Sequence, residues 1–190
     1  MDNSKLLDWM KKVNKTYGSE IVELNVVEKD LDLIPFTSPR LNYMSYGGVP
    51  RGRITEFYGE ESSGKSTLCL DLMANFQKKW PDEYILYNYI EGTYDAKWAS
   101  NMGVKPDTVV ILNCLGQYAE EVFDQVKEAM ETGAFGLMIL DSIGAMYSKQ
   151  ASEKSFEEKT YGGIALSLTQ FVNQCVPIIK RNNIAFVGIN

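Results

Sequence analysis

Eight residues from Gly59 to Ser66 have the types and spacing of a phosphate-binding loop. Their sequence, Gly-Glu-Glu-Ser-Ser-Gly-Lys-Ser, fits the pattern G-x-x-x-x-G-K-[ST]. The two glycines allow backbone conformations in which successive N–H groups face one anion, and a following helix adds its positive dipole end. Lys65 would reach the β- and γ-phosphates of a nucleotide, and the Ser66 hydroxyl would ligate Mg²⁺. The alternative is a glycine-rich turn that happens to carry a lysine, but the strand-like run before it and the helix-like run after it favour the phosphate loop.

The residues assigned to phosphate and metal binding form one continuous stretch. They are Gly59, Glu60, Glu61, Ser62, Ser63, Gly64, Lys65, Ser66 and Thr67.

Two acidic residues follow apolar runs elsewhere in the chain. Asp141 comes directly after residues 137–140, which is a Walker B pattern, so its carboxylate would hold Mg²⁺ through water opposite Ser66. Glu91 comes directly after the run 83–90 and would orient or deprotonate the water that attacks the γ-phosphate. By themselves the two residues also fit an ordinary strand exit and a capping or surface glutamate.

Composition limits the catalytic groups and the kind of nucleic-acid binding that the chain could have. The 190 residues are 45% hydrophobic and 23% charged, which is typical of one globular domain, and they include no histidine. Hydrolytic chemistry would therefore use carboxylates, lysine and a metal ion. The net charge of -6 argues against nucleic-acid binding by the whole surface but leaves room for a local basic groove.

Cysteine usage and hydropathy predict a cytoplasmic protein. Cys69, Cys114 and Cys175 are widely spaced in apolar contexts, which indicates reduced core thiols rather than a zinc site or disulfides. The amino terminus has no signal-peptide pattern. Residues 160–179 carry no charge, but Ser167, Gln170, Asn173 and Gln174 lie opposite Ile164, Leu168, Phe171 and Cys175, so this stretch predicts an amphipathic helix and no membrane span.

Periodicity predicts an α/β fold. Apolar runs predict strands over residues 53–58, 83–90, 109–113, 137–141 and 184–189. Helical spacing predicts helices over residues 4–17, from about 66 to before Pro81, and over 94–102, 117–132 and 160–179. Residues 21–27 predict a short strand, and residues 28–52, rich in proline and glycine, predict a connector without regular elements.

Alternating strands and helices give a parallel sheet with helices on both faces, and right-handed crossovers bring all carboxyl ends of the strands to one edge. Gly59, Glu91 and Asp141 each follow a strand, so we expect them to meet at that edge.

Four segments resemble the bacterial and phage RecA recombinase family. They are residues 51–67, 91–104, 140–145 and 186–190, and the Glu-Ser-Ser-Gly-Lys core of the loop is characteristic within the wider P-loop class. The resemblance implies a RecA-type P-loop NTPase core over residues 34–190, with a mostly parallel twisted sheet covered on both faces. It implies a short helix and strand arm over residues 1–33 that docks on another subunit. The alternative for the amphipathic helix in this arm is packing on its own core.

The resemblance also implies roles for single residues. Lys65 and Glu91 would be catalytic, Ser66 and Asp141 would hold Mg²⁺, and Asn190 would end the strand that leads to the family's nucleotide sensor. Asp95 and Trp98 would contact the adenine of ATP, although Trp98 also fits a core position on a short helix.

Contact with single-stranded DNA would come from the loop before the helix predicted over 160–179, through Lys154, Lys159, Gly162 and Gly163. This loop balances lysines with glutamates, and no Lys or Arg occurs from 160 to 179, so a solvated loop is the alternative.

The expected function is the ATP- and Mg²⁺-binding core of a DNA recombinase that assembles on single-stranded DNA and promotes strand exchange with ATP hydrolysis. The family's second DNA loop, its further strands and the cations that enter a neighbour's active site do not occur in these 190 residues. We therefore expect nucleotide binding to exceed hydrolysis, since comparable cations contribute roughly 10³ to 10⁵ in rate. Two alternatives are a RecA-fold helicase or regulatory ATPase, and an assembly module that nucleotide organises without turnover.

Overall fold

The computed structural model describes residues 4–18, 22, 31–90, 94–149 and 163–190, and the chain divides into two compact units, Met1–Leu31 and Asp32–Asn190. The first unit contains helix α1 (Ser4–Tyr17), which has the bounds predicted from periodicity. No residue of α1 is buried, and Leu6, Leu7, Trp9 and Tyr17 are exposed. The strand predicted over 21–27 lies outside the described residues, except for Val22, whose backbone exchanges two 2.9 Å hydrogen bonds with the Asn14 side chain.

Five parallel strands form the main sheet of the second unit, in the order β3–β7–β6–β4–β5. Their bounds are β3 Arg53–Phe57, β4 Tyr84–Tyr89, β5 Val109–Asn113, β6 Phe135–Asp141 and β7 Ala185–Ile189. Every residue of β7 and every residue of β6 except Phe135 is buried, because both strands lie inside the sheet and are covered on two faces. This confirms the α/β fold with a parallel sheet.

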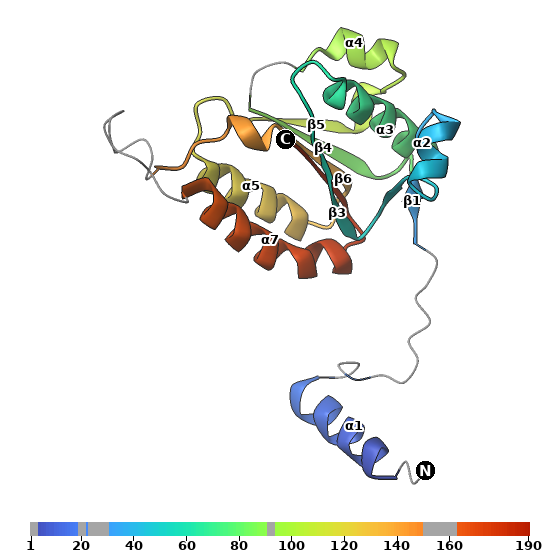
Figure 1. The fold of residues 1–190 in the computed structure, drawn as a ribbon, viewed down its shortest axis with the longest axis vertical. Coiled ribbons are helices and arrows are strands. Elements are labelled where there is room, and N and C mark those ends of the chain that lie inside the picture. The colour runs from blue at the N-terminus through green and yellow to red at the C-terminus, as the bar shows by residue number, and fades with distance from the viewer. Residues whose placement is uncertain (1–3, 19–21, 23–30, 91–93, 150–162) are drawn as a thin grey trace. The chain divides into compact units, whose positions relative to one another are not determined.

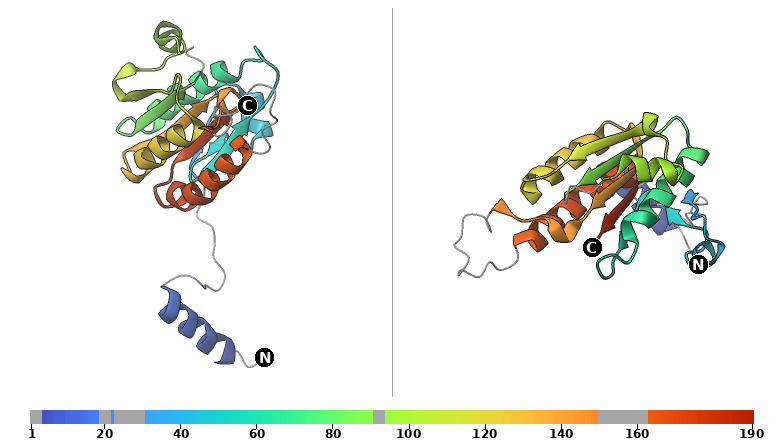
Figure 2. Two further views of the ribbon diagram at one scale, coloured as in Figure 1. Left: turned by 90° about the vertical axis from the view of Figure 1, so that its left-hand side faces the viewer. Right: turned by 90° about the horizontal axis from the view of Figure 1, so that it is seen from above.

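Helices cover both faces of this sheet (Figures 1 and 2). Helix α3 (Lys65–Lys79) packs on one face, and helices α5 (Ala119–Glu131) and α7 (Gly163–Arg181) pack on the other. Helix α4 (Ala96–Asn101) and the 3-10 turn η1 (Pro106–Thr108) lie between β4 and β5 in the chain. All four predicted core helices are present, with ends shifted by one to three residues.

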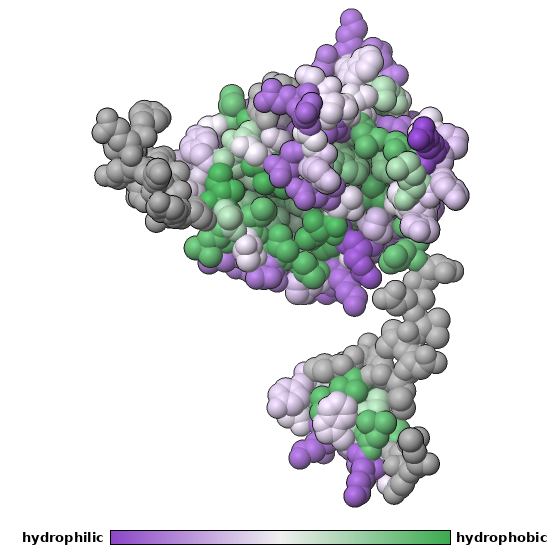
Figure 3. All heavy atoms as spheres, in the orientation of Figure 1, coloured by the Kyte–Doolittle hydropathy of each residue, from purple (hydrophilic) through white to green (hydrophobic). Residues whose placement is uncertain are grey.

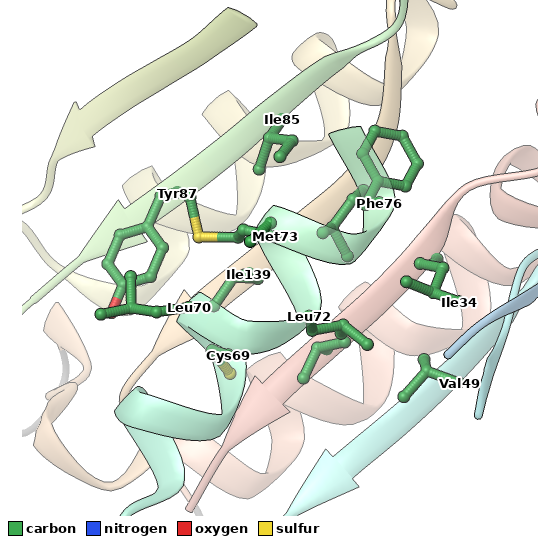
Figure 4. Packing of buried hydrophobic residues seen from close by; sticks show 14 of the residues in the cluster. Ile34, Val49, Cys69, Leu70, Leu72, Met73, Phe76, Ile85, Tyr87 and Ile139 are labelled. Atoms are coloured by element: carbon green, nitrogen blue, oxygen red, sulfur yellow. The ribbon is translucent and has the colours of Figure 1, made fainter. Parts of the chain in front are cut away.

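The core is split by the sheet into two apolar layers. On the α3 side, Leu72, Met73 and Phe76 pack against Ile85 and Ile139 (Figure 4). On the other side α5 and α7 contribute Val122, Val126, Cys175 and Ile179 among others, and the rings of Phe123 and Phe171 stack with centroids 4.6 Å apart. Both layers hold the strands rigidly, so the loops at the carboxyl edge start from fixed positions.

The prediction of a connector without regular elements over residues 28–52 was wrong. This stretch contains β1 (Leu33–Ile34), α2 (Pro39–Met44) and β2 (Val49–Pro50), and β1 pairs antiparallel with β2. Helix α2 begins with proline after the capping residue Ser38, an arrangement in which proline starts a helix rather than breaking it. Elements this short carry no periodic pattern, so proline and glycine content alone misled the prediction.

Helix α7 has the predicted buried side but a less polar exposed side. Phe171 and Cys175 are buried, yet Leu166 and Val176 are exposed, and Figure 3 shows hydrophobic surface over α5 and α7. Within the described parts of the chain, no helix combines the length and apolar character needed to cross a bilayer.

Candidate nucleotide-binding site

The loop between β3 and α3 has the backbone that a phosphate-binding loop requires. Ser62 and Gly64 have positive φ angles of 58° and 93°. Such angles let successive backbone N–H groups turn toward one side of the loop, which an extended chain does not allow. At Gly59 an added Cβ would lie 3.1 Å from Ser63 Oγ, so the loop closes tightly where glycine stands. Both glycines of the motif therefore occupy positions where a side chain would strain the loop.

The amino end of α3 is available for an anion. Gly64 is the N-cap residue, and within the described residues no side-chain hydrogen bond caps this end of the helix. The first-turn N–H groups have no partner within a helix, and the dipole adds positive potential to them. The Lys65 ammonium donates to the Gly59 and Glu60 carbonyl oxygens at 2.6 and 2.9 Å, which holds its charge over the loop.

A pocket of about 740 Å³ opens at this edge of the sheet. The phosphate loop, the end of β6 with the turn that follows, and the end of β7 form its walls. Its lining residues are Gly59, Glu61, Ser62, Ser63, Gly64, Lys65, Ser66, Thr67, Asp141, Ser142, Gly144, Ala145, Ile189 and Asn190. Carboxyl ends of neighbouring parallel strands thus bring residues from distant parts of the sequence to one place.

The end of β7 is joined directly to the start of the phosphate loop. Gly59 N–H donates to the Asn190 carbonyl oxygen at 3.1 Å, and Asn190 N–H donates to the Phe57 carbonyl oxygen at 2.9 Å. The Asn190 amide also donates to Glu56 Oε1 at 3.0 Å. The backbone of Asn190 therefore contacts both β3 and the first residue of the loop, and its side chain contacts β3.

Asp141 lines the pocket and accepts a hydrogen bond from a tyrosine. The residue is 7% exposed, and the Tyr87 hydroxyl on the neighbouring strand β4 donates to Asp141 Oδ2 at 2.5 Å. Burial raises the pKa of Tyr87, and the negative charge of Asp141 and this hydrogen bond raise it further. Burial, with a smaller effect of Asp141, also raises the pKa of Cys69 on α3. Tyr87 therefore stays protonated and remains a hydrogen-bond donor to the Asp141 carboxylate.

Alkaline pH should weaken the fold through Tyr87. Its pKa is raised from 10.0 by folding, so its contribution to stability is complete below pH 10 and is lost as the pH rises toward the folded pKa. In urea titrations above pH 10, Tyr87→Phe should make the fall in unfolding free energy shallower by about 1.4 kcal/mol per pH unit. Near pH 7 the variant should lose about 1–3 kcal/mol, because a hydrogen bond to a buried charge is gone. Cys69, Cys114 and Cys175 are present in both proteins, so equal alkaline slopes would show that Tyr87 does not couple to folding.

Comparison with known proteins finds one family that matches nearly the whole chain. Residues 5–190 match the model of the RecA N-terminal domain. The chain is 31% identical over 185 residues to Protein RecA of Campylobacter lari, covering 95% of this chain and 52% of the relative. It is 31% identical over 194 residues to Protein RecA of Campylobacter hominis (100% and 55%) and 30% identical over 184 residues to that of Aquifex pyrophilus (95% and 52%). The chain belongs to the RecA family. It spans about half the length of these RecA relatives.

Two predicted site residues of this RecA-family chain, Asp95 and Trp98, lie apart from the pocket. Asp95 is the N-cap of α4 and accepts hydrogen bonds from the Lys97 and Trp98 N–H groups at 2.9 Å each. Trp98 is 46% exposed on α4, and among the described residues neither it nor Asp95 lines the pocket. Their contact with adenine stays a prediction. Glu91 lies outside the described residues, as do Lys154, Lys159 and Gly162, while Gly163 is the first residue of α7.

Some pocket residues of this RecA-family chain were not predicted from sequence. Ser142, Gly144, Ala145 and Ile189 line the pocket beside the residues that the motifs marked. Ser142 is the N-cap residue of the 3-10 turn η2 (Ile143–Ala145), and Gly144 and Ala145 lie within it, so their position shortly after Asp141 was the available signal. Glu56 and Tyr87 act through Asn190 and Asp141, and no motif marks either of them.

Proposed function

We propose that this chain is the ATP- and Mg²⁺-binding part of a RecA-type DNA recombinase. In full form such a protein would assemble on single-stranded DNA and promote homologous strand exchange with DNA-dependent ATP hydrolysis. The supporting observation is one pocket that is lined by the phosphate loop, Asp141 and Asn190, from three strands of the sheet. Membership in the RecA family supports ATP and single-stranded DNA as the substrates.

The pocket residues suit a nucleoside triphosphate. The first-turn N–H groups of α3 and the Lys65 ammonium would hold the phosphate oxygens, because Lys65 can exchange the loop carbonyls that it now contacts for anionic partners. Glu91 would activate the attacking water, and Asp95 and Trp98 would contact adenine. Asn190 would report the state of the γ-phosphate to the strand that carries it.

The donor set also suits magnesium. The Ser66 hydroxyl and the Asp141 carboxylate are hard oxygen ligands, and Asp141 keeps one oxygen that does not receive the Tyr87 bond. Among the described residues no three His, Cys, Asp or Glu side chains gather as a metal cluster. That fits Mg²⁺, which proteins usually bind through one or two side chains together with substrate phosphates. The ion would neutralise charge on the phosphates.

Partners follow from the family. We propose that Lys154, Lys159, Gly162 and Gly163 contact single-stranded DNA, and that the amino-terminal arm docks on a second copy of the protein through the exposed apolar residues of α1. We place the protein in the cytoplasm, in keeping with three buried cysteines that carry free thiols.

The metal role is tested by replacing Asp141 with asparagine. Calorimetric titration should show that Mg²⁺ no longer strengthens ATP binding. In the presence of Mg²⁺, the affinity of the variant for ATP should be about 10- to 100-fold lower than that of the wild type. Binding of ATP in EDTA should change little, since Asp141 does not belong to the loop. Asp82→Asn, at an exposed turn, removes the same charge and serves as the control. A variant at Asp141 that keeps the full Mg²⁺ dependence would contradict the assignment.

A further inference from the structure

The Tyr87 hydroxyl reaches Asp141 because the two residues share one face of the sheet. Tyr87 on β4 pairs with Ile139 on β6, and Asp141 follows two residues later on β6. Side chains two residues apart on a strand lie on the same face, and Tyr87 and Ile139 both belong to the apolar layer on the α3 side. The hydrogen bond therefore crosses from one strand to its neighbour near the carboxyl edge, where the pocket opens.

Packing holds the Tyr87 ring independently of its hydroxyl. Tyr87 is 3% exposed and lies in the same apolar layer as Cys69, Leu70 and Ile139 (Figure 4). On the other side its ring contacts the Tyr94 ring, with centroids 5.0 Å apart. Replacing Tyr87 with phenylalanine should therefore keep the ring in place and remove only the hydroxyl group.

The hydroxyl fixes one of the two oxygens of the Asp141 carboxylate. Among the described hydrogen bonds, the Asp141 side chain takes part in one, which Oδ2 accepts from Tyr87. A buried carboxylate oxygen without a partner is costly, so this bond holds the orientation of the group. Oδ1 is then the oxygen that remains for a cation, or for water bound to it, in the pocket that Asp141 lines together with Ser66.

The number of oxygens that a carboxylate offers affects which cation it suits. Ca²⁺ takes more oxygen ligands than Mg²⁺ and often uses both oxygens of one carboxylate. Mg²⁺ requires a nearly octahedral arrangement and usually keeps several waters beside one or two carboxylates and the substrate phosphates. A carboxylate that offers one fixed oxygen therefore suits Mg²⁺, whereas one that can turn freely could offer both oxygens to Ca²⁺.

We propose that Tyr87 is a positioning residue that leaves Asp141 a single oxygen for the cation and thereby favours Mg²⁺ over Ca²⁺ in the nucleotide pocket. This inference rests on the proposed function, which gives Asp141 its role in metal binding. Tyr87 acts through the Asp141 carboxylate and needs no contact of its own with the nucleotide or the ion.

Charge and positioning predict different outcomes for Tyr87→Phe. A donated hydrogen bond draws negative charge from a carboxylate, so charge alone predicts that both cations bind more tightly once the hydroxyl is removed. A general loss of stability would weaken binding with either cation. Loss of positioning should weaken binding with Mg²⁺ but not with Ca²⁺. The ratio of ATP affinity in Mg²⁺ to ATP affinity in Ca²⁺ should then fall about tenfold, the low end for loss of a group that holds a metal ligand.

The test is calorimetric titration of ATP in Mg²⁺, in Ca²⁺ and in EDTA, well below the Tm of each protein, with circular dichroism to check folding. Tyr84→Phe is the matched control, because Tyr84 is exposed at the amino end of β4, where its ring contacts Phe135 at the start of β6. It should keep the wild-type ratio. A ratio in Tyr87→Phe equal to that in Tyr84→Phe would overturn the inference, as would an equal change with both cations.

Two ring-substituted residues at position 87 test the hydrogen bond itself. para-Aminophenylalanine keeps a donor and should keep the wild-type ratio of affinities. para-Fluorophenylalanine fills most of the space of the hydroxyl without a donor, so it should lower the ratio as phenylalanine does. Since it leaves little empty space, the fluorinated protein decides the question even if Tyr87→Phe does not fold. Equal ratios in these two proteins would show that the hydrogen bond does not set the preference.

The inference and the proposed function fail in distinguishable ways. If Asp141→Asn keeps the full Mg²⁺ dependence of ATP binding, the metal role of Asp141 is wrong and the inference falls with it. If Asp141→Asn loses that dependence while Tyr87→Phe keeps the wild-type ratio, only the inference is overturned. When Asp141 is already asparagine, Tyr87→Phe should change the ratio no further, because the two residues act through one contact.

Discussion

Lys65→Ala is expected to abolish the thermal stabilisation that ATP with Mg²⁺ gives the wild-type chain. A ligand at about one hundred times its Kd adds about 2.7 kcal/mol to the free energy of unfolding. For a chain of this size that corresponds to a rise of roughly 5–10 °C in Tm. Lys65 contacts only the Gly59 and Glu60 carbonyls among its described hydrogen-bond partners, so its loss should leave the Tm without nucleotide nearly unchanged. Differential scanning fluorimetry with and without ATP and Mg²⁺ measures both values.

Lys78→Ala provides the matched control for this experiment. Lys78 lies in the last turn of the same helix, is exposed, and donates to Asn75 Oδ1 rather than to the phosphate loop. It should keep the full response to nucleotide. If Lys65→Ala responded to ATP as Lys78→Ala does, the phosphate-binding role of the loop would have to be abandoned.

Arg51→Met is expected to cause the largest loss of stability. Arg51 is 4% exposed, and its guanidinium lies 4.5 Å from the Trp80 ring centroid. It donates from Nε to the Asn183 carbonyl oxygen at 2.9 Å and through both terminal nitrogens to the Glu83 carboxylate. Arg51, Glu83 and Asn183 precede β3, β4 and β7, so one side chain ties together the starts of three strands.

The expected cost is about 2–4 kcal/mol, because a buried charged group with all these partners is lost while Glu83 remains able to reach water. Tm should fall by roughly 5–15 °C. The control is Arg53→Met, which removes a nearby positive charge. The Arg53 side chain donates a hydrogen bond only to the carbonyl oxygen of the neighbouring Gly52 among its described partners. A drop in Tm no larger than that of the control would show that the Arg51 cluster does not tie the strands. The cluster lies at the amino ends of the strands, so nucleotide affinity measured well below Tm should be unchanged.

Among the described residues, those that belong to a local motif could be predicted from sequence as candidate site residues. A phosphate loop is local, so its eight residues, its strand and its helix could all be read from one stretch of sequence. Asp141 was predictable because a buried strand ends there. Glu56 and Tyr87 could not be predicted, since each acts on a partner far away in the sequence, Asn190 and Asp141 respectively.

The fold shows the same division. Long elements with clear periodicity were predicted nearly to their ends, as with α1 and β5, and their alternation predicted the parallel sheet. The short elements α2, β1 and β2 were missed, because a strand of two residues has no pattern and depends on its partner. The contact of Glu120 with Ser167 exists only because α5 and α7 pack side by side.

The sequence alone determined that the chain has a phosphate-loop motif, an acidic residue at the end of an apolar strand and a RecA-type order of elements, since each of these depends on neighbouring residues. Only the tertiary structure decided that β7 lies between β3 and β6, because strand order depends on packing across the sheet. That order places Asn190 against Gly59 and brings Asp141 to the same pocket as the phosphate loop. The loop supplies the groups proposed to bind phosphate, and the sheet supplies the other walls of the pocket.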